Sequence, residues 1–119
     1  MNSKIATAFF KSYGLPEPEY EYKHIPGRSF RLDVAWPKKR IGIESQGGIY
    51  GYRPSHTSAR QILRDMEKDN LGLAHGWVVF KFQPAVVLMK ECIDMLLMVW
   101  DLERKYEEPK AIAEPTPTE

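Results

Sequence analysis

Apolar and polar residues alternate along two neighbouring segments in the first half of the chain, and this period of two is typical of half-buried β-strands. Every second position in these segments is large and apolar: Leu32, Val34, Trp36, Ile41 and Ile43. A Pro-Lys-Lys sequence separates the two segments and favours a turn. A third alternating segment, residues 19–23, places Tyr20 and Tyr22 between charged residues. The pattern therefore predicts three successive strands.

Three other segments have apolar residues at intervals of three and four, the spacing of an amphipathic helix. They cover residues 3–13, 58–75 and 85–106. Capping or terminating residues stand at the ends of the first two: Ser3 and Gly14, then Thr57 or Ser58 and Gly76. The second helix has only a narrow apolar stripe, whereas the broad stripe of the third is typical of core packing. Residues 77–82 include consecutive apolar residues and predict a fourth, largely buried strand.

The resulting order of helix, three strands, helix, strand and helix describes one α/β domain whose sheet is covered by helices. A length of 119 residues suits a single core, and 43% hydrophobic residues with a net charge of +1 are typical of a globular protein. We expect one domain over residues 1–106. Residues 107–119 are acidic and rich in proline, and predict a disordered tail.

Composition also limits the chemistry and the location. No apolar run reaches the roughly 18–20 residues that a membrane-spanning helix needs, so we expect no membrane partner. The single cysteine, Cys92, lies in an apolar run at helical spacing and predicts a reduced core thiol in a cytoplasmic protein. His24 and His75 show no spacing that suggests a zinc site, and we interpret them as surface or capping residues.

Two acidic residues stand inside the predicted strands, where charged side chains are depleted. If the strands form a hairpin, Asp33 and Glu44 can lie on one face, within reach of a single hard cation. Such a pair favours Mg²⁺ or Mn²⁺ and metal-assisted hydrolysis, because these ions prefer oxygen ligands. Alternatively, Asp33 pairs with Arg28 or Arg31, and Glu44 pairs with a lysine, at the end of the sheet.

A set of polar and glycine residues in the middle of the chain has a distinctive order and spacing. It comprises Asp33, Glu44-Ser45-Gln46, Gly47-Gly48, His56, Asp65, Lys68, Asn70 and Gly76-Trp77. This constellation resembles the PD-(D/E)XK nuclease superfamily, and is most similar to small nucleases related to very-short-patch-repair endonucleases. The resemblance covers residues 19–82. It implies a restriction-endonuclease-like fold, in which a helix, a three-stranded antiparallel meander, a helix, a strand and a helix form a central mixed sheet flanked by helices.

The resemblance also implies a metal site and a reaction. Asp33 and Glu44 would hold Mg²⁺ or Mn²⁺, with the backbone carbonyl of Ser45 as a further ligand and Glu19 as a candidate third acid. The bound ion would polarise a phosphoryl oxygen and lower the pKa of a water. The implied reaction is hydrolysis of a phosphodiester.

The chain departs from the commonest superfamily pattern two residues after the second acid, where Gln46 stands in place of a lysine. Some branches of the superfamily carry this lysine on the following helix, and Lys68 is the candidate here. Lys68 would stabilise the attacking hydroxide or the transition state by charge, while Gln46 orients a water. His56 is a candidate proton donor or phosphate contact, and Asp65 a supporting residue. Without the resemblance, Asp65 and Lys68 would be interpreted as a surface ion pair.

Basic residues are concentrated around the proposed site: Arg28, Arg31, Lys38, Lys39, Arg40, Arg53, Arg60 and Arg64. They favour DNA as the partner, through salt-dependent contacts to phosphates. Tyr50 and Tyr52 can stack on an unpaired base, which favours recognition of DNA structure over DNA sequence. The predicted protein is a divalent-metal-dependent DNA endonuclease that dimerises through its last helix. The alternative is a noncatalytic nucleic-acid-binding or scaffold protein that keeps the nuclease fold and has lost activity at Gln46.

Overall fold

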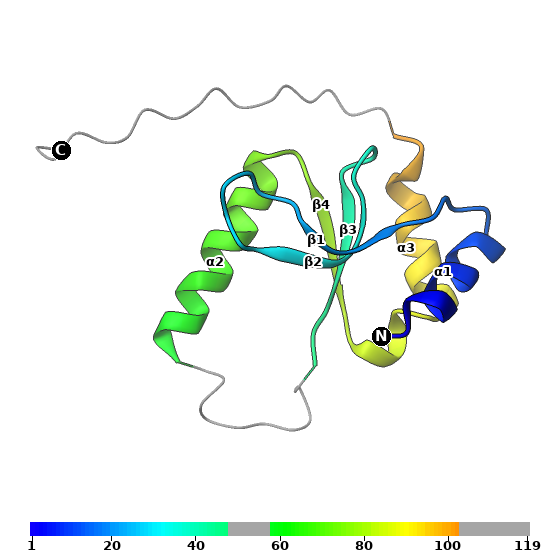
Figure 1. Ribbon diagram of the computed structural model, residues 1–119, viewed down its shortest axis with the longest axis horizontal. Coiled ribbons are helices and arrows are strands. Elements are labelled where there is room, and N and C mark those ends of the chain that lie inside the picture. Colours follow the sequence, from blue (N-terminus) through cyan, green and yellow to red (C-terminus); the bar gives the residue numbers. More distant parts are fainter. Residues whose placement is uncertain (48–57, 103–119) are drawn as a thin grey trace, which may run out of the picture.

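The computed structural model describes residues 1–47 and 58–102, and this part of the chain contains three α-helices and a four-stranded mixed sheet (Figure 1). The elements are α1 (Ser3–Ser12), β1 (Glu19–Lys23), β2 (Arg31–Trp36), β3 (Ile41–Ser45), α2 (Ala59–Ala74), β4 (Val78–Phe82), the short 3₁₀ helix η2 (Pro84–Val86) and α3 (Lys90–Trp100). The predicted α/β class is confirmed. The proposed tail, residues 107–119, and the glycine-rich loop with His56, Tyr50 and Tyr52 lie outside the described residues.

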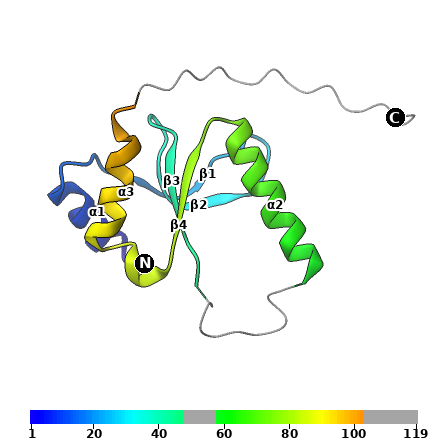
Figure 2. The ribbon, with the colours of Figure 1, turned by 180° about the vertical axis from the view of Figure 1, so that it is seen from behind.

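The strands follow one another across the sheet in the order β1-β2-β3-β4. Neighbouring strands are antiparallel from β1 to β3, whereas β4 runs parallel to β3. The turn between β2 and β3 is closed by a hydrogen bond of 3.0 Å from the Lys39 amide to the Trp36 carbonyl. Helices α1 and α3 lie on one face of the sheet and α2 lies on the other, as the opposite views in Figures 1 and 2 show. The sheet is thus the middle of three layers.

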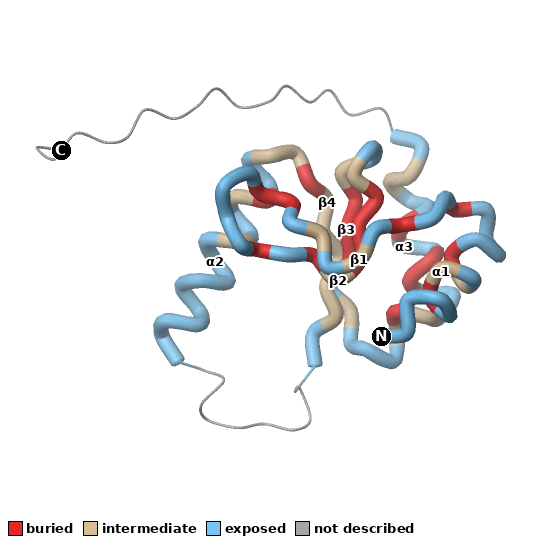
Figure 3. Tube along the Cα trace, in the orientation of Figure 1, coloured by how far each residue is buried: buried red, intermediate tan, exposed pale blue. Residues whose placement is uncertain are grey.

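The larger core fills the space between the sheet and the α1/α3 layer, where many of the residues coloured as buried in Figure 3 lie. Its buried members are Ala6, Phe10, Leu15, Val34, Trp36, Ile41, Ile43, Val87, Cys92, Ile93 and Leu96. The Phe10 and Trp36 rings meet edge to face at 5.0 Å, and Trp36 Nε1 donates a hydrogen bond of 2.8 Å to the Pro16 carbonyl. The indole is therefore packed on its ring and satisfied at its polar atom. Cys92 is a free, buried cysteine, as predicted.

A smaller core lies between the sheet and α2. Its buried members are Leu32, Ala35 and Trp77, with Tyr22 and Val79 packed against them. The apolar stripe predicted for this helix is largely exposed, with exposed fractions from 50% to 73% at Ile62, Leu63, Met66 and Leu73. Helix α2 is consequently held to the sheet by few apolar contacts, which its pale, exposed trace in Figure 3 reflects.

Strands β1 and β2 do not keep the strict alternation expected from the sequence. Val34 belongs to the larger core and Leu32 to the smaller one, so these two side chains lie on opposite faces of the sheet. Their partners on β1 change face in the same way. Tyr20 pairs with Val34 and packs against the larger core, whereas Tyr22 pairs with Leu32 and packs against the smaller core. Between these pairs Glu21 has a φ of 49°, in the left-handed region that non-glycine residues rarely adopt. The prediction that alternate apolar residues of β2 share one face is therefore wrong, because a local twist turns both strands over at the same level.

Gly42 of β3 makes room for the displaced Leu32. A β-carbon at residue 42 would collide with Leu32 Cδ1 and would lie 3.2 Å from the Val34 carbonyl oxygen. Leu32 can therefore fill the smaller core only because its neighbour on β3 has no side chain.

Two helix ends differ from those expected. The side chain of Asn2, rather than Ser3, caps α1 by accepting hydrogen bonds from the amides of Lys4 and Ile5 at 3.0 and 3.2 Å. The third helix begins at Lys90 rather than near residue 85, because Pro84 starts a separate 3₁₀ turn. The predicted cap of the second helix is confirmed, since the Ser58 hydroxyl accepts a hydrogen bond of 3.2 Å from the Gln61 amide.

Among the residues that the structure describes, no helix has the length and apolar character required to cross a membrane.

Candidate active site

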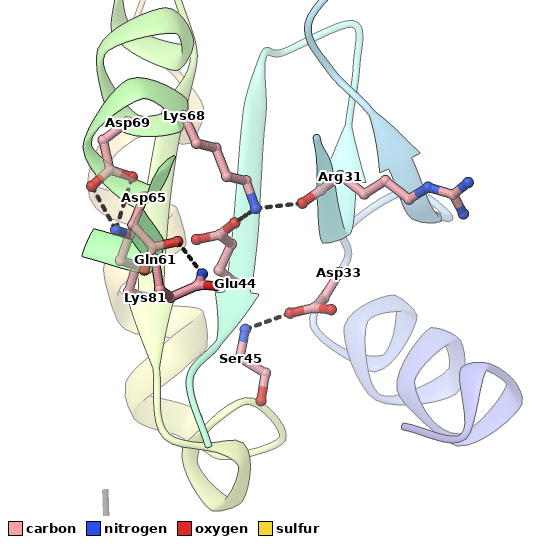
Figure 4. Close-up of polar contacts among 9 residues, drawn as sticks. All are labelled: Arg31, Asp33, Glu44, Ser45, Gln61, Asp65, Lys68, Asp69 and Lys81. Carbon is pink, nitrogen blue, oxygen red and sulfur yellow. Dashed lines mark hydrogen bonds and ion pairs between the residues drawn. The ribbon is translucent and has the colours of Figure 1, made fainter. Parts of the chain in front are cut away.

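The two acids singled out by the sequence lie at the same end of adjacent strands. Strands β2 and β3 pair through Trp36 with Ile41, Ala35 with Gly42 and Val34 with Ile43. Asp33 and Glu44 are the next residues along their strands, at the level where the backbone of β2 turns over. Both side chains are half-buried, as is Ser45. Their surroundings decide what this pair can do, and Figure 4 shows them in detail.

Asp33 takes the place of a backbone acceptor at the end of the β2–β3 pairing. Its Oδ2 accepts a hydrogen bond of 2.6 Å from the Ser45 amide (Figure 4). The contact is short because the acceptor is an ionised carboxylate. In an extended strand the N–H and C=O of one residue point to the same side, so the Ser45 carbonyl also faces β2.

Lys68 reaches the same place from α2. Its ammonium group donates one hydrogen bond to Glu44 Oε1 and another, of 2.7 Å, to the backbone carbonyl of Arg31 (Figure 4). The Lys68 and Glu44 side chains are only 20% and 13% exposed. Burial lowers the pKa of Lys68 from its usual value, and the negative charge of Asp33 counteracts this in part. The geometry thus brings Lys68 to Glu44, which is the alternative in which Glu44 pairs with a lysine. The catalytic role expected of Lys68 stays a prediction.

A second ion pair stands beside the first. Lys81 of β4 is the partner of Glu44 in the parallel register, and its ammonium group contacts both carboxylate oxygens of Asp69 at 2.8 Å (Figure 4). Charges of opposite sign therefore alternate from Asp33 through Lys68, Glu44 and Lys81 to Asp69. The sequence reasoning missed Lys81, although its position opposite Glu44 follows once β4 is aligned parallel to β3.

The two acids line different cavities. Asp33 and Ser45 line a cavity of about 710 Å³ between the sheet and the start of α1, together with Glu21. Glu44 and Lys68 line a cavity of about 220 Å³ between the sheet and α2. The site therefore lies at one end of the two central strands, with one acid lining a cavity on each face of the sheet.

His24 is a buried residue of the α2 side and not the surface residue that the sequence suggested. It is 5% exposed, and its ring meets Trp77 edge to face at 5.6 Å. Burial, with the positive charge of Lys68 and then of His75, lowers the pKa of His24 to about 4. Its imidazole is consequently neutral near pH 7. His75 is the C-cap residue of α2, and capping is one of the two roles predicted for it.

Two other predicted residues, Asp65 and Glu19, lie apart from the Asp33–Glu44–Lys68 group. Asp65 is exposed and accepts a hydrogen bond of 3.0 Å from the Gln61 side chain, which makes it a surface residue of α2. Glu19 is exposed and pairs with Ala35, whereas Glu21 lines the cavity with Asp33. The Gln46 side chain is exposed, and the backbone N–H of Gln46 donates a hydrogen bond of 2.8 Å to the Phe82 carbonyl. His56 lies outside the described residues.

The donor atoms near Asp33 suit a hard divalent cation. Two carboxylates and the Ser45 carbonyl supply only oxygen, and Mg²⁺ is commonly held by one or two carboxylates while it keeps several waters. Within residues 1–47 and 58–102, no group of three or more His, Cys, Asp or Glu side chains could hold a metal ion. An ion here would depend on Asp33, Glu44, the Ser45 carbonyl and water.

Comparison of the chain with protein-family models, with curated proteins and with solved structures gives no match. The functional argument therefore rests on the residues and their geometry.

Proposed function

We propose that this protein is a divalent-metal-dependent DNA endonuclease with a restriction-endonuclease-like fold. One observation carries the proposal: Asp33 and Glu44, from adjacent strands, and Lys68, from the following helix, converge at one end of the β2–β3 pair. Two acids with one cation are the groups that phosphodiester hydrolysis requires, because they can position an ion and stabilise charge on the phosphate. The order of elements and the mixed sheet agree with this fold.

Each residue then has a defined role. Asp33, Glu44 and the Ser45 carbonyl hold Mg²⁺ or Mn²⁺, which supplies Lewis acidity and a water of lowered pKa when bound. Lys68 keeps a positive charge next to Glu44, where it balances negative charge on the phosphate or on the attacking oxygen. The half-buried setting strengthens this effect, since charges interact more strongly away from bulk water. Gln46 orients a water through its exposed side-chain amide.

The surface around Phe30 suits the DNA backbone. The guanidinium groups of Arg28 and Arg64 lie over the Phe30 ring, at 4.8 and 4.9 Å from its centroid, and this holds both cations at the junction of α2 with the β1–β2 connection. Arg28 is neutralised by Glu67, whereas Arg64 contacts the Ser29 hydroxyl at 3.5 Å. Contacts of these arginines with phosphates would position DNA without reading its sequence, which supports selection by DNA structure.

We place a homodimer contact on α3. This helix exposes four large apolar side chains, between 39% and 69% exposed: Met95, Leu97, Met98 and Leu102 just beyond its end. A second copy would remove this apolar surface from water.

A noncatalytic DNA-binding protein is the second candidate. The observation that favours it is that the charged groups already have partners within the protein, Glu44 with Lys68 and Asp33 with the Ser45 amide. Such mutual satisfaction is also what a purely structural cluster shows.

Cleavage assays separate the two candidates. Branched, single-stranded and duplex DNA are incubated with the protein in Mg²⁺, in Mn²⁺ and in EDTA. The nuclease predicts metal-dependent cleavage that Asp33→Asn and Glu44→Gln abolish, while the exposed control substitution Glu17→Gln, outside both the site and α3, leaves it unchanged. Salt-dependent DNA binding without cleavage under every condition would support the noncatalytic candidate and exclude the nuclease.

A further inference from the structure

Helix α2 carries its apolar residues on the side that faces away from the sheet. Ile62, Leu63 and Met66 are 50%, 63% and 55% exposed. Lys68, two residues beyond Met66, lies on the opposite side of the helix, where it reaches Glu44. The helix is therefore amphipathic in the reverse sense, with a polar inner side and an apolar outer side. An amphipathic helix normally buries its apolar side, so this surface indicates a partner.

The outward residues have the spacing of a seam between paired helices. Ala59, Met66 and Leu73 follow one another at intervals of seven residues, and Ile62 and Leu63 occupy the turn between the first two. All five are exposed. Two helices that pack side by side bury residues with this repeat. We call Ala59, Ile62, Leu63 and Met66 the α2 seam.

The first turns of α2 are open to a second molecule. This end of the helix extends beyond the sheet in the opposite views of Figures 1 and 2. Every residue from Ser58 to Glu67 is exposed, as the pale trace in Figure 3 shows. An incoming helix can therefore reach the α2 seam without displacing any described element.

We propose that the α2 seam pairs with the α2 seam of a second copy of this chain, antiparallel and about a twofold axis next to Leu63. The charges beside the seam favour this occupant and this orientation. Arg60 and Glu67 lie on the same flank of the seam, seven residues apart. Antiparallel pairing brings Arg60 of each copy to Glu67 of the other, whereas parallel pairing would place like charges together.

One register satisfies both the charges and the apolar residues. With Arg60 opposite Glu67, the axis passes midway between these two positions along the helix. Leu63 then faces Leu63 of the other copy, and Ile62 faces Met66. The seam is thus complementary to itself, which is what a twofold contact between identical chains requires.

Both charged groups are available for this contact. Within the described residues Arg60 makes no ion pair. Arg28 contacts Glu67 at Oε1, and the Glu67 side chain remains 48% exposed, so its Oε2 can accept a hydrogen bond from the second copy. The opposite flank is acidic, but Asp69 there has Lys81 as its counter-charge, which limits repulsion between the copies.

The contact would also hold Lys68 in place. The paired stretch covers residues 59–68 of each copy, and Lys68 lies on its inner side. The smaller core supplies few apolar contacts to α2, and burial of the outer side adds the apolar contacts that it lacks. This contact is independent of the one placed on α3, and a protein with both would assemble beyond a dimer.

Sedimentation equilibrium from micromolar to millimolar concentrations measures the contact. All samples carry Met98→Gln, which weakens association through α3. Leu63→Gln places an amide at the axis, and Leu73→Gln is its matched control, a similarly exposed leucine of the same helix beyond the paired stretch. We expect a dimer for Met98→Gln alone, a dissociation constant roughly tenfold higher or more with Leu63→Gln, and no change with Leu73→Gln.

An exchange of charges tests the orientation. Arg60→Glu and Glu67→Arg each bring two like-charged pairs across the axis, so each variant alone should be monomeric. An equimolar mixture of the two variants should form a heterodimer, because every pair then joins opposite charges. Both positions are exposed, so thermal melting should show that both variants are folded.

A monomer at every concentration, or a dimer that Leu63→Gln leaves intact, would overturn the contact and leave a different protein as the occupant of the α2 seam. Equal weakening by Leu73→Gln, or no association in the mixture of charge variants, would overturn the antiparallel pairing. None of these results depends on DNA cleavage, so the nuclease and the α2 contact stand or fall separately.

Discussion

The ammonium group of Lys68 on α2 donates a hydrogen bond to the carboxylate of Glu44 on β3, so one ion pair links the loosely packed helix to the centre of the sheet. The same ammonium group also bonds to the Arg31 carbonyl at 2.7 Å, and so bridges β2 and β3 where their pairing ends. The packing of α2 on the sheet and the proposed catalytic role therefore depend on the same side chain.

Removal of Lys68 should destabilise the fold. Lys68→Met leaves the half-buried Glu44 carboxylate and the Arg31 carbonyl without a partner, which we expect to cost about 1–3 kcal/mol in the free energy of unfolding. The double variant Lys68→Met/Glu44→Gln should recover part of this loss, because no buried charge then remains unpaired. Urea denaturation measures both effects.

Lys81→Met is the matched control for this prediction. It breaks the neighbouring pair with Asp69, whose side chains are 33% and 47% exposed, and exposed pairs contribute roughly 0–1 kcal/mol. A loss at Lys81 as large as that at Lys68 would contradict the importance given to the Glu44 contact.

Gly42 and Leu32 should show strong energetic coupling. Gly42→Ala places a methyl group against Leu32 Cδ1, and overpacking of this kind costs roughly 1–3 kcal/mol. Leu32→Ala alone should cost about 2–5 kcal/mol because it empties part of the smaller core. The double variant should be more stable than the sum of the two losses predicts. Additive losses in chemical denaturation would mean that Leu32 does not lie over Gly42.

The stability of the protein should depend on pH through His24. Its pKa is about 4 in the folded protein and about 6.5 when unfolded, so the unfolded chain binds more protons between these values. The contribution of His24 to the free energy of unfolding is fully present above pH 6.5. It falls as the pH is lowered towards 4, by about 3 kcal/mol in total. His24→Phe keeps an aromatic ring against Trp77 and should lack this component. Equal pH dependence of unfolding in parent and variant would refute the assignment.

Cys92 should be chemically silent in the native protein. Its side chain is fully buried, and burial raises the pKa of the thiol to about 12. Reagents that react with thiolates should therefore label Cys92 only as fast as the protein unfolds or opens locally. Labelling at the same rate in buffer and in denaturing urea would show that the α3 side of the core is more open than described.

Much of the fold could be predicted from hydrophobic periodicity, because the strands and helices of the larger core obey it. Ile41 and Ile43 alternate as expected, and Ser58 caps α2 as expected. The change of face along β1 and β2 could not be predicted. It depends on the left-handed backbone conformation of Glu21, which glutamate rarely adopts. The burial of His24 was missed for a similar reason, because its neighbours Trp77 and Gly72 come from a distant part of the chain.

The candidate site was predictable in its residue types more than in its contacts. The positions of Asp33, Glu44 and Lys68 follow from strand pairing and one helix. The hydrogen-bond partners of these side chains do not follow in the same way. Asp33 bonds to the Ser45 amide and Lys68 to the Arg31 carbonyl, and these backbone groups are free to bond to side chains only where the β2–β3 pairing ends. Asp65 lies one turn from Lys68 on the same helix, yet it faces Gln61, since the first turns of α2 extend away from the sheet.

The small size of the core beneath α2 has a dynamic consequence. Regions with few buried apolar contacts open locally at a lower free energy than the rest of a domain. We expect the amide hydrogens of α2 to exchange with solvent faster than those of α3, whose Cys92, Ile93 and Leu96 are buried in the larger core. The ammonium group of Lys68 then belongs to the part of the molecule that moves, while Glu44 belongs to the part that stays in place.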